Sequence, residues 1–218
     1  MDIDSDSLIP FVVFLLIFVI QAVSLEKRFR KRAEESDSVP EQDEVDVWQA
    51  TYQNIPLKFF GGGAHHNFDY YYTRSSKVDV SSIDEVMQWL LGCVYVSDQA
   101  QFNVRDHWQH PSDFEETRKG DCEDFALWAW RKLVELGHDA EFMVGKWMHD
   151  GRVGTHAWVF LRHEGEQYVF ESTGRSPERI LKEYSVARDN YVPFAAVDSR
   201  LRKKVYKGML HWIANNDR

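Results

Sequence analysis

The chain has 218 residues and a formal net charge of −9, from 35 acidic and 26 basic side chains. Eight tryptophans, nine tyrosines and fourteen phenylalanines are enough to fill the core of one globular domain of about 150 to 180 residues. The acidic balance, without a long Arg/Lys block in the folded part, argues against nucleic-acid binding, so we expect no nucleic-acid partner.

An uncharged, apolar segment lies near the N-terminus, at residues 8–25. As a helix it spans roughly 27 Å, about the thickness of a bilayer core, so we predict a transmembrane helix there. A cleaved signal peptide is the alternative, but it would start with positive charge, whereas residues 1–7 are acidic. Five basic residues follow the span, between Lys27 and Arg32, and none precede it. The positive-inside rule therefore predicts a single-pass protein whose domain is cytoplasmic.

Residues 26–47, first basic and then acidic, read as a solvated tether to a domain at 48–218. The start of that domain is aromatic and contains a glycine triplet at 61–63, followed by His65 and His66. No Cys or carboxylate at metal-ligand spacing accompanies the His pair, so we interpret this stretch as a loop rather than a metal site.

Three helix starts follow. Ser82–Glu85 and Ser112–Glu115 have the capping-box pattern. The third helix starts after Gly120, with Asp121 as its N-cap, and Gly137 is placed to end it. Its apolar residues recur at steps of four and three, which draws one stripe on a helix. The stripe consists of Cys122, Ala126, Ala129, Leu133 and Leu136.

Cys122 is the candidate nucleophile, because the partial positive charge of a helix N-terminus favours a thiolate. The flanking carboxylates disfavour the thiolate, so a cationic partner is required, and His156 is the candidate. A small buried hydrophobe is the alternative reading of Cys122. Cys93 reads as a core residue. A disulfide between the two would consume the nucleophile, so we expect both cysteines to be free, which fits a reducing compartment.

Three strands are predicted after that helix, at residues 140–147, 156–162 and 167–172, with a hairpin turn at 163–166. Glu171 on the last strand is the candidate acid that orients His156. It shares the face of His156 only if its cross-strand partner is an even-numbered residue. An ordinary solvent-facing strand acid is the alternative. The tail at 200–212 reads as a helix, with solvent or an anionic membrane surface as its surroundings.

These residues resemble the bacterial transglutaminase-like cysteine proteinases of the papain/transglutaminase superfamily. The resemblance runs from about Ile83 to Val197, and its most specific part is Trp-x-x-Pro at 108–111 followed by Gly-Asp-Cys-Glu-Asp at 120–124. The motifs at 95–98, 156–157 and 191–193 continue it. It implies an α+β domain with the nucleophile helix packed on an antiparallel sheet. The family's acid is usually Asp, whereas this chain has Glu171.

The resemblance also implies a function, a membrane-anchored cysteine peptidase that acts on a protein or peptide through Cys122, His156 and Glu171. Acyl transfer to an amine, or a silent binding module of the same fold, are the alternatives. Papain-like sites use a donor upstream of the Cys in an oxyanion hole, and Gln109 and Trp108 are the candidates, with packing as the alternative for Trp108. The chemistry requires no cofactor.

Two further implications come from relatives. In some of them the acids beside the nucleophile bind calcium, and Asp121 and Glu123 occupy those positions, although helix capping explains Asp121 equally well. Several relatives are exported, which makes a periplasmic domain the alternative to a cytoplasmic one. The sequence predicts no oligomeric state.

Overall fold

Seven strands form an antiparallel sheet in the part of the chain, residues 45–216, that the structure, a computed structural model, describes. The strand order is β1-β9-β8-β4-β5-β6-β7, so the β4–β5 hairpin lies inside the sheet. The strands are β1 (Ala50–Tyr52), β4 (Asp139–His149), β5 (Arg152–His163), β6 (Glu166–Phe170), β7 (Leu181–Glu183), β8 (Tyr191–Val197) and β9 (Lys203–Tyr206). Two short strands, β2 (Val94–Tyr95) and β3 (Lys119–Gly120), pair in parallel outside this sheet.

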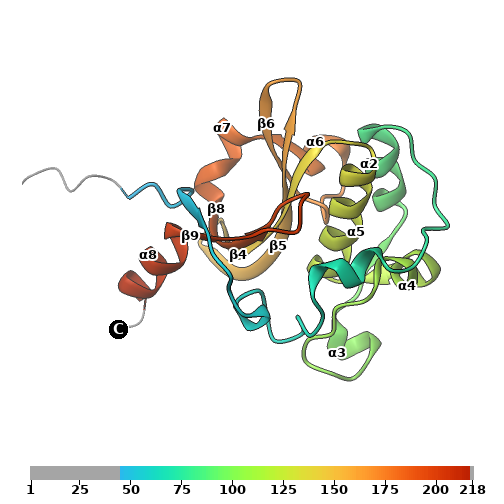
Figure 1. Cartoon of the computed structure of the whole chain (residues 1–218), viewed down its shortest axis with the longest axis horizontal. Helices are drawn as coiled ribbons and strands as arrows, with labels where there is room; N and C mark the ends of the chain where they lie inside the picture. Colours follow the sequence, from blue (N-terminus) through green and yellow to red (C-terminus); the bar gives the residue numbers. More distant parts are fainter. Residues whose placement is uncertain (1–44, 217–218) are drawn as a thin grey trace, which may run out of the picture. The chain divides into compact units, whose positions relative to one another are not determined.

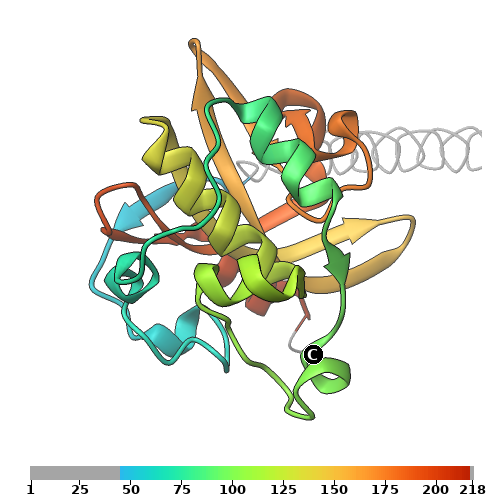
Figure 2. The ribbon, with the colours of Figure 1, turned by 90° about the vertical axis from the view of Figure 1, so that its right-hand side faces the viewer.

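Helices lie on both sides of the sheet, as Figure 1 shows. α2, α4 and α5 lie on one side, with α5 in contact with β4 and β5, and α7 and α8 lie on the side away from α5. Figure 2 looks onto the α5 side. The helices are α2 (Ile83–Leu91), α3 (Asp98–Gln101), α4 (Pro111–Thr117), α5 (Cys122–Glu135), α6 (Pro177–Ile180), α7 (Tyr184–Ala187) and α8 (Lys207–Asn216), with 3₁₀ turns at Leu57–Phe59, Phe68–Tyr72 and Arg188–Asn190.

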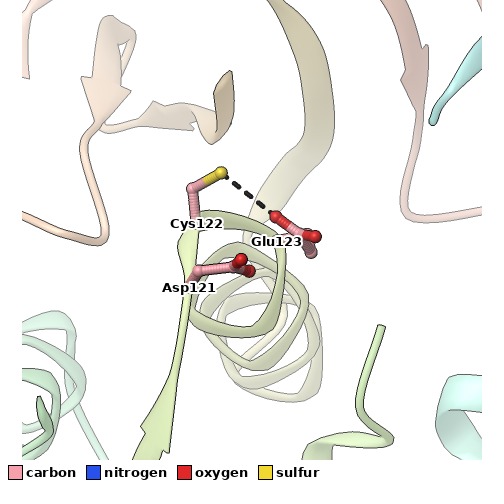
Figure 3. A group of neighbouring side chains, drawn as sticks. All are labelled: Asp121, Cys122 and Glu123. Atoms are coloured by element: carbon pink, nitrogen blue, oxygen red, sulfur yellow. Dashed lines mark hydrogen bonds between the residues drawn. The ribbon is translucent and has the colours of Figure 1, made fainter. Parts of the chain in front are cut away.

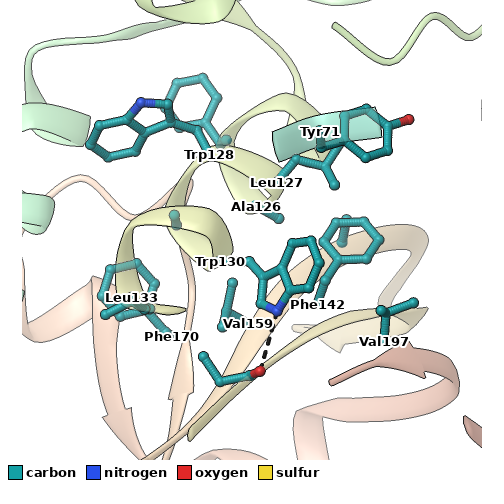
Figure 4. Close-up of a cluster of buried hydrophobic side chains, with 14 of the residues drawn as sticks. Tyr71, Ala126, Leu127, Trp128, Trp130, Leu133, Phe142, Val159, Phe170 and Val197 are labelled. Carbon is teal, nitrogen blue, oxygen red and sulfur yellow. Dashed lines mark hydrogen bonds between the residues drawn. The ribbon is translucent and has the colours of Figure 1, made fainter. Parts of the chain in front are cut away.

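The helix α5 is buried between the sheet and the helices α2 and α4. Trp128, Trp130 and Leu133 have no exposed surface, which is the pattern of a helix covered on more than one face. The Trp130 indole donates to the Ala140 carbonyl of β4 at 3.2 Å (Figure 4). On the other side, Trp128 stacks on Trp89 of α2 with ring centroids 3.9 Å apart. These contacts fix where the first turn of α5 lies relative to the sheet.

The strand β5 contributes side chains to two hydrophobic cores, one on each face of the sheet. Ala157, Val159 and Leu161 face the core shared with α5. Trp158 and Phe160 face a second core on the other side. Because strand side chains alternate, His156 lies on the same face of β5 as Trp158. The two rings are stacked with their centroids 6.2 Å apart.

The predicted α+β class, with a helix packed on an antiparallel sheet, is confirmed. β4, β5 and β6 include most residues of the three predicted strands, and the hairpin turn has positive φ at Glu164 and Gly165, as a two-residue turn requires. Both cysteines are free and Cys93 is buried, as expected.

Two local predictions are wrong. The tail at 200–212 is not one helix, because Lys203–Tyr206 form β9, which pairs with both β1 and β8. Two ladders of backbone hydrogen bonds override the weak helical pattern. The helix α4 is capped by His110 and not by Ser112: the His110 ring accepts from the Ser112 N–H at 3.1 Å, and Pro111 suits the first helical position.

The predicted transmembrane segment at 8–25 lies outside the described residues. Within residues 45–216, no helix is long and apolar enough to cross a membrane.

Candidate active site

Cys122 occupies the first position of α5, as predicted. Asp121 is the N-cap residue, and its backbone N–H donates to the Asp124 side chain at 3.3 Å. Figure 3 shows the side chains of Asp121, Cys122 and Glu123 at the end of this helix. The helix N-terminus therefore presents the thiol together with two carboxylates.

The Cys122 thiol is held in its protonated form in this arrangement. It is half-buried and donates a hydrogen bond to Glu123 Oε2 at 3.1 Å (Figure 3). Burial, then the negative charges of Glu123 and Asp121, raise the pKa of Cys122 well above its usual value. A hydrogen bond from the Ala157 backbone acts in the opposite direction. The bond also places the sulfur beside the residue that follows His156.

His156 and Glu171 are joined directly. The His156 Nε2 atom lies 2.8 Å and 2.9 Å from the two carboxylate oxygens of Glu171. The β5–β6 ladder ends at Val159 opposite Phe170. Continuing that register by one residue places Glu171 opposite Trp158 and diagonal to His156 on the same face. Because Nε2 faces the carboxylate of Glu171, Nδ1 is the ring nitrogen that can accept a proton from another group.

Two hydroxyls hold the Glu171 carboxylate. Thr173 donates to Oε1 at 2.6 Å and Tyr191 donates to Oε2 at 2.8 Å. Burial alone would raise the pKa of Glu171, but the charge of His156 and the hydrogen bonds from His156, Thr173 and Tyr191 lower it to about 2. Glu171 is therefore ionised at neutral pH although it is buried.

His156 and Glu171 line a cleft with a volume of about 1100 Å³. Its walls come from the ends of β4 and β5 on one side and from α6, β7 and α7 on the other, and Tyr95 also lines it. No hydrogen bond joins Cys122 to His156 among residues 45–216; the thiol is turned to Glu123 instead. The cleft gives an extended molecule access to the imidazole.

Comparison with known proteins agrees with the motifs and the fold. The model of the bacterial transglutaminase-like cysteine proteinases (BTLCP) matches residues 65–180, more than half of the chain.

The chain belongs to this family.

The resemblance inferred from the motifs is thereby confirmed, and with it the transglutaminase-like α+β fold. Solved structures give weaker similarities. Calcium-bound and EGTA-treated LapG of Legionella pneumophila are each 20% identical with a TM-score of 0.42, over 66% of this chain and 77% and 75% of LapG. A structure described as a TGase is 18% identical with a TM-score of 0.32, over 68% of this chain and 38% of its own. Similarities of this size carry no functional conclusion. No curated protein sequence matches.

In this BTLCP chain, five carboxylates gather around the start of α5. They are Asp98, Asp106, Asp121, Glu123 and Asp124, and ligand atoms from groups of three lie within 4.8 Å of one another. Burial, followed by the charges of neighbouring acids, raises the pKa of Asp98 to about 6. Burial likewise raises the pKa of Asp124 to about 7, and the pKa values of Asp121 and Glu123 are also raised. The cluster therefore resists holding its full negative charge.

Some of these oxygens have partners within the protein and others do not. The Asp124 carboxylate accepts from the Gln109 backbone at 2.8 Å and from its side-chain amide at 2.6 Å. Three carboxylate oxygens are buried without a hydrogen-bond partner in the part of the chain that the structure describes. They are the Oδ1 atoms of Asp98, Asp106 and Asp121. Unpartnered buried carboxylate oxygens are costly, and they are the ligands that hard cations prefer.

The oxyanion assignment of Gln109 is contradicted by these contacts. Its side-chain amide donates to both Asp124 and the Lys119 carbonyl at 2.9 Å, and Gln109 is buried. Both donors are used to attach the segment before α4 to the start of α5. Trp108 is also buried and packs on Phe68 and Phe142, so packing explains its presence.

Other members of the site were not assigned from the sequence. Asp98 stands inside a motif of the resemblance and Asp106 stands two residues before Trp108, but nothing in their spacing ties them to residues 121–123. Tyr191 also stands inside a motif of the resemblance, but its contact with Glu171, like that of Thr173, appears only in the structure. Tyr95 lines the cleft, and burial, then the nearby Cys122, raises its pKa, so its phenol stays a donor. His65 and His66 take no part in the metal-ligand groups found among the described residues.

Proposed function

We propose that this BTLCP chain is a cysteine peptidase in which Cys122 is the nucleophile, His156 the general base and Glu171 the orienting acid. The observation that supports it most is the buried, ionised Glu171 bonded to His156 Nε2 at 2.8 Å. An imidazole held in this way leaves Nδ1 to take the thiol proton, and its charged form has a counter-ion. The position of Cys122 at the start of α5, beside Ala157, supports the same roles.

In the proposed reaction His156 removes the proton from Cys122, and the sulfur attacks the carbonyl carbon of a peptide bond. The backbone N–H of Cys122, at the open first turn of α5, is a donor for the oxyanion. His156 then gives its proton to the leaving amine, which leaves a thioester on Cys122. Water, activated by His156, hydrolyses the thioester and restores the thiol.

Alkylation rates test the nucleophile. In full-length protein with calcium chloride near neutral pH, we expect iodoacetamide to modify Cys122 at least about tenfold faster than Cys93, because only Cys122 has a helix N-terminus and a base to favour its thiolate. Replacing His156 with Ala should slow the Cys122 reaction and leave Cys93 unchanged, as read by peptide mass spectrometry. Equal rates at both cysteines in folded wild-type protein would refute the nucleophile assignment.

Product analysis separates the peptidase from its alternatives. A peptidase releases new N-termini from a protein substrate such as casein, whereas a transglutaminase attaches a fluorescent primary amine to it. The family of cysteine proteinases favours the first outcome. A binding module that has lost catalysis would do neither, even with a reactive Cys122.

We also propose a calcium site at Asp98, Asp106, Asp121 and Glu123. The donor set fits, because it consists of oxygens and includes three buried ones without partners in the described residues. When bound, the cation supplies positive charge beside the thiol and so lowers the pKa of Cys122.

Thermal unfolding tests the calcium site without relying on activity. We expect calcium chloride to raise the Tm above its value in EGTA, because the ion binds only the folded protein. Asp106→Asn should reduce the rise, and Glu166→Gln, which changes an exposed acid on β6, should keep it. An equal rise in both variants would place the ion elsewhere.

Finally, we propose that residues 8–25 anchor the domain in the membrane, with the domain in the cytoplasm. The apolar span and the five basic residues after it are the support for this proposal.

A further inference from the structure

Half of β5 has an unpaired edge. β5 pairs with β4 along almost its whole length, from Arg152 to Arg162. Its other edge pairs with β6 only from Val159 to His163. In the described chain, the edge at residues 153–157 therefore has no partner strand, and this is the edge that lines the cleft, through Gly154, Thr155 and His156.

The backbone groups on that edge can be assigned. β4 and β5 are joined by a two-residue turn, Asp150-Gly151, with positive φ at both residues and His149 paired to Arg152. The residues flanking such a turn bond each other, and the direction alternates along the strand. Residues 152, 154, 156 and 158 thus bond β4, while Val153, Thr155 and Ala157 point away from it. The β5–β6 hairpin agrees with this alternation, because the pair His163 and Glu166 that flanks its two-residue turn places the odd-numbered residues of β5 on the edge away from β4.

This edge lacks the features that normally block strand pairing. Natural edge strands are blunted by charges, proline, bulges or a covering segment, whereas this edge carries Val153, which is 53% exposed, and then Gly154 and Thr155. The fold itself does not require Gly154: a Cβ there would meet nothing within 4 Å, and its φ is not positive. A glycine inside a strand often marks the close approach of another backbone.

From these observations we infer that an extended segment of the protein substrate binds as an added strand along Val153–Thr155. This inference rests on the proposed function, since the occupant is the chain that presents the scissile bond. The edge leads directly to His156 and to the Ala157–Cys122 contact, so a strand paired there passes the nucleophile. Backbone hydrogen bonds to Val153 and Thr155 would supply affinity that does not depend on the substrate's side chains.

A peptide probe without side chains isolates this backbone pairing. We would compare acetyl-triglycyl chloromethyl ketone with chloroacetone, which has the same reactive group and no peptide. In both, the Cys122 sulfur forms a bond to carbon and chloride leaves. The measured quantity is the ratio of the two second-order rates of Cys122 modification in full-length protein with calcium chloride. We expect the ratio to be at least about ten in the wild type.

Two variants should lower that ratio about tenfold. Thr155→Pro removes the N–H that faces the cleft without removing a bond to β4. Gly154→Val adds a side chain to the cleft wall where the folded protein has open space, so it should fold normally even if the proline variant does not. Lys146→Met is the matched control, because it removes the contact of Lys146 with the Thr155 hydroxyl at 3.0 Å and leaves the edge intact. It should change the ratio less than twofold.

The outcomes separate the two proposals. Chloroacetone reacting no faster at Cys122 than at Cys93 would refute the proposed function. A reactive Cys122 with an unchanged ratio in folded Gly154→Val would overturn the edge inference alone. Hydrogen exchange gives a second reading: the Thr155 amide should be protected by the peptide adduct and not by the chloroacetone adduct. Protection of that amide in a dimer of the free protein would assign the edge to a second copy instead.

Discussion

Tyr191 connects the proposed acid to the core of the domain. Its hydroxyl donates to Glu171 at 2.8 Å, while its ring packs on Trp158 with centroids 5.0 Å apart. Burial, followed by the charge of Glu171, raises the pKa of Tyr191, so the phenol is protonated and able to donate at neutral pH. Tyr191 therefore acts on the reaction through Glu171, as a positioning residue.

Replacing Tyr191 with Phe removes this donor and keeps the ring. We expect kcat to fall about tenfold with little change in KM, because a hydrogen bond to a charged group contributes about 1.5 to 3 kcal/mol. Losing a donor to the carboxylate should also raise the pKa of Glu171, so the acidic limb of the pH–rate profile should move to higher pH.

A control variant distinguishes positioning from simple loss of packing. Tyr184→Phe removes a hydroxyl from the second core, where Tyr184 packs against Trp48 at 5.0 Å, without touching Glu171. It should leave the pH–rate profile in place. If both variants lower kcat equally and neither moves the profile, Tyr191 is only a packing residue.

Among the helices and strands, the sequence predicts those that local residue patterns encode. The stripe from Cys122 to Leu136 and the turn at 163–166 were read correctly, because helical periodicity and turn residues are local signals. β8 and β9 were not predicted, because their strand character comes from pairing with β4, β1 and each other. The partners of Glu171 and the five-acid cluster depend on contacts between distant segments, which spacing in one sequence does not report.

Substitution by alanine is expected to affect the free energy of unfolding differently at two glycines of the β4–β5 hairpin. A Cβ at Gly145 would collide with the Val192 carbonyl and with Pro193 of β8, whereas one at Gly154 would meet nothing. Gly145→Ala should therefore lower the unfolding free energy by about 1 to 3 kcal/mol. Gly154→Ala should leave it unchanged or raise it by up to about 1 kcal/mol. Urea unfolding followed by tryptophan fluorescence measures both, and similar losses in both would contradict the β4–β8 packing.

For the molecule as a whole, Glu171 should make stability depend on acid pH. Its pKa falls from 4.5 to about 2 on folding, so its stabilising contribution is full above about pH 4.5. That contribution is lost as the pH falls through the folded pKa towards 2, and its size is on the order of 3 kcal/mol. Between pH 6 and pH 2.5 in EGTA, wild type should therefore lose more unfolding free energy than Glu171→Gln does. Glu166→Gln controls for the removal of one carboxylate, and should lose as much as wild type.

The membrane topology is the largest-scale prediction. Five basic residues follow the apolar span at 8–25, and the seven residues before it carry three aspartates and no Lys or Arg. Basic residues beside a span stay in the cytoplasm, so the domain should lie there. A fluorescent protein that matures only in the cytoplasm should therefore be bright when fused after residue 218, and alkaline phosphatase at the same site should be inactive. Exchanging the charges, with Asp at the five basic positions and Lys at the three aspartates, should reverse both signals. Active phosphatase on the unaltered chain would mean that an export signal outweighs the local charges.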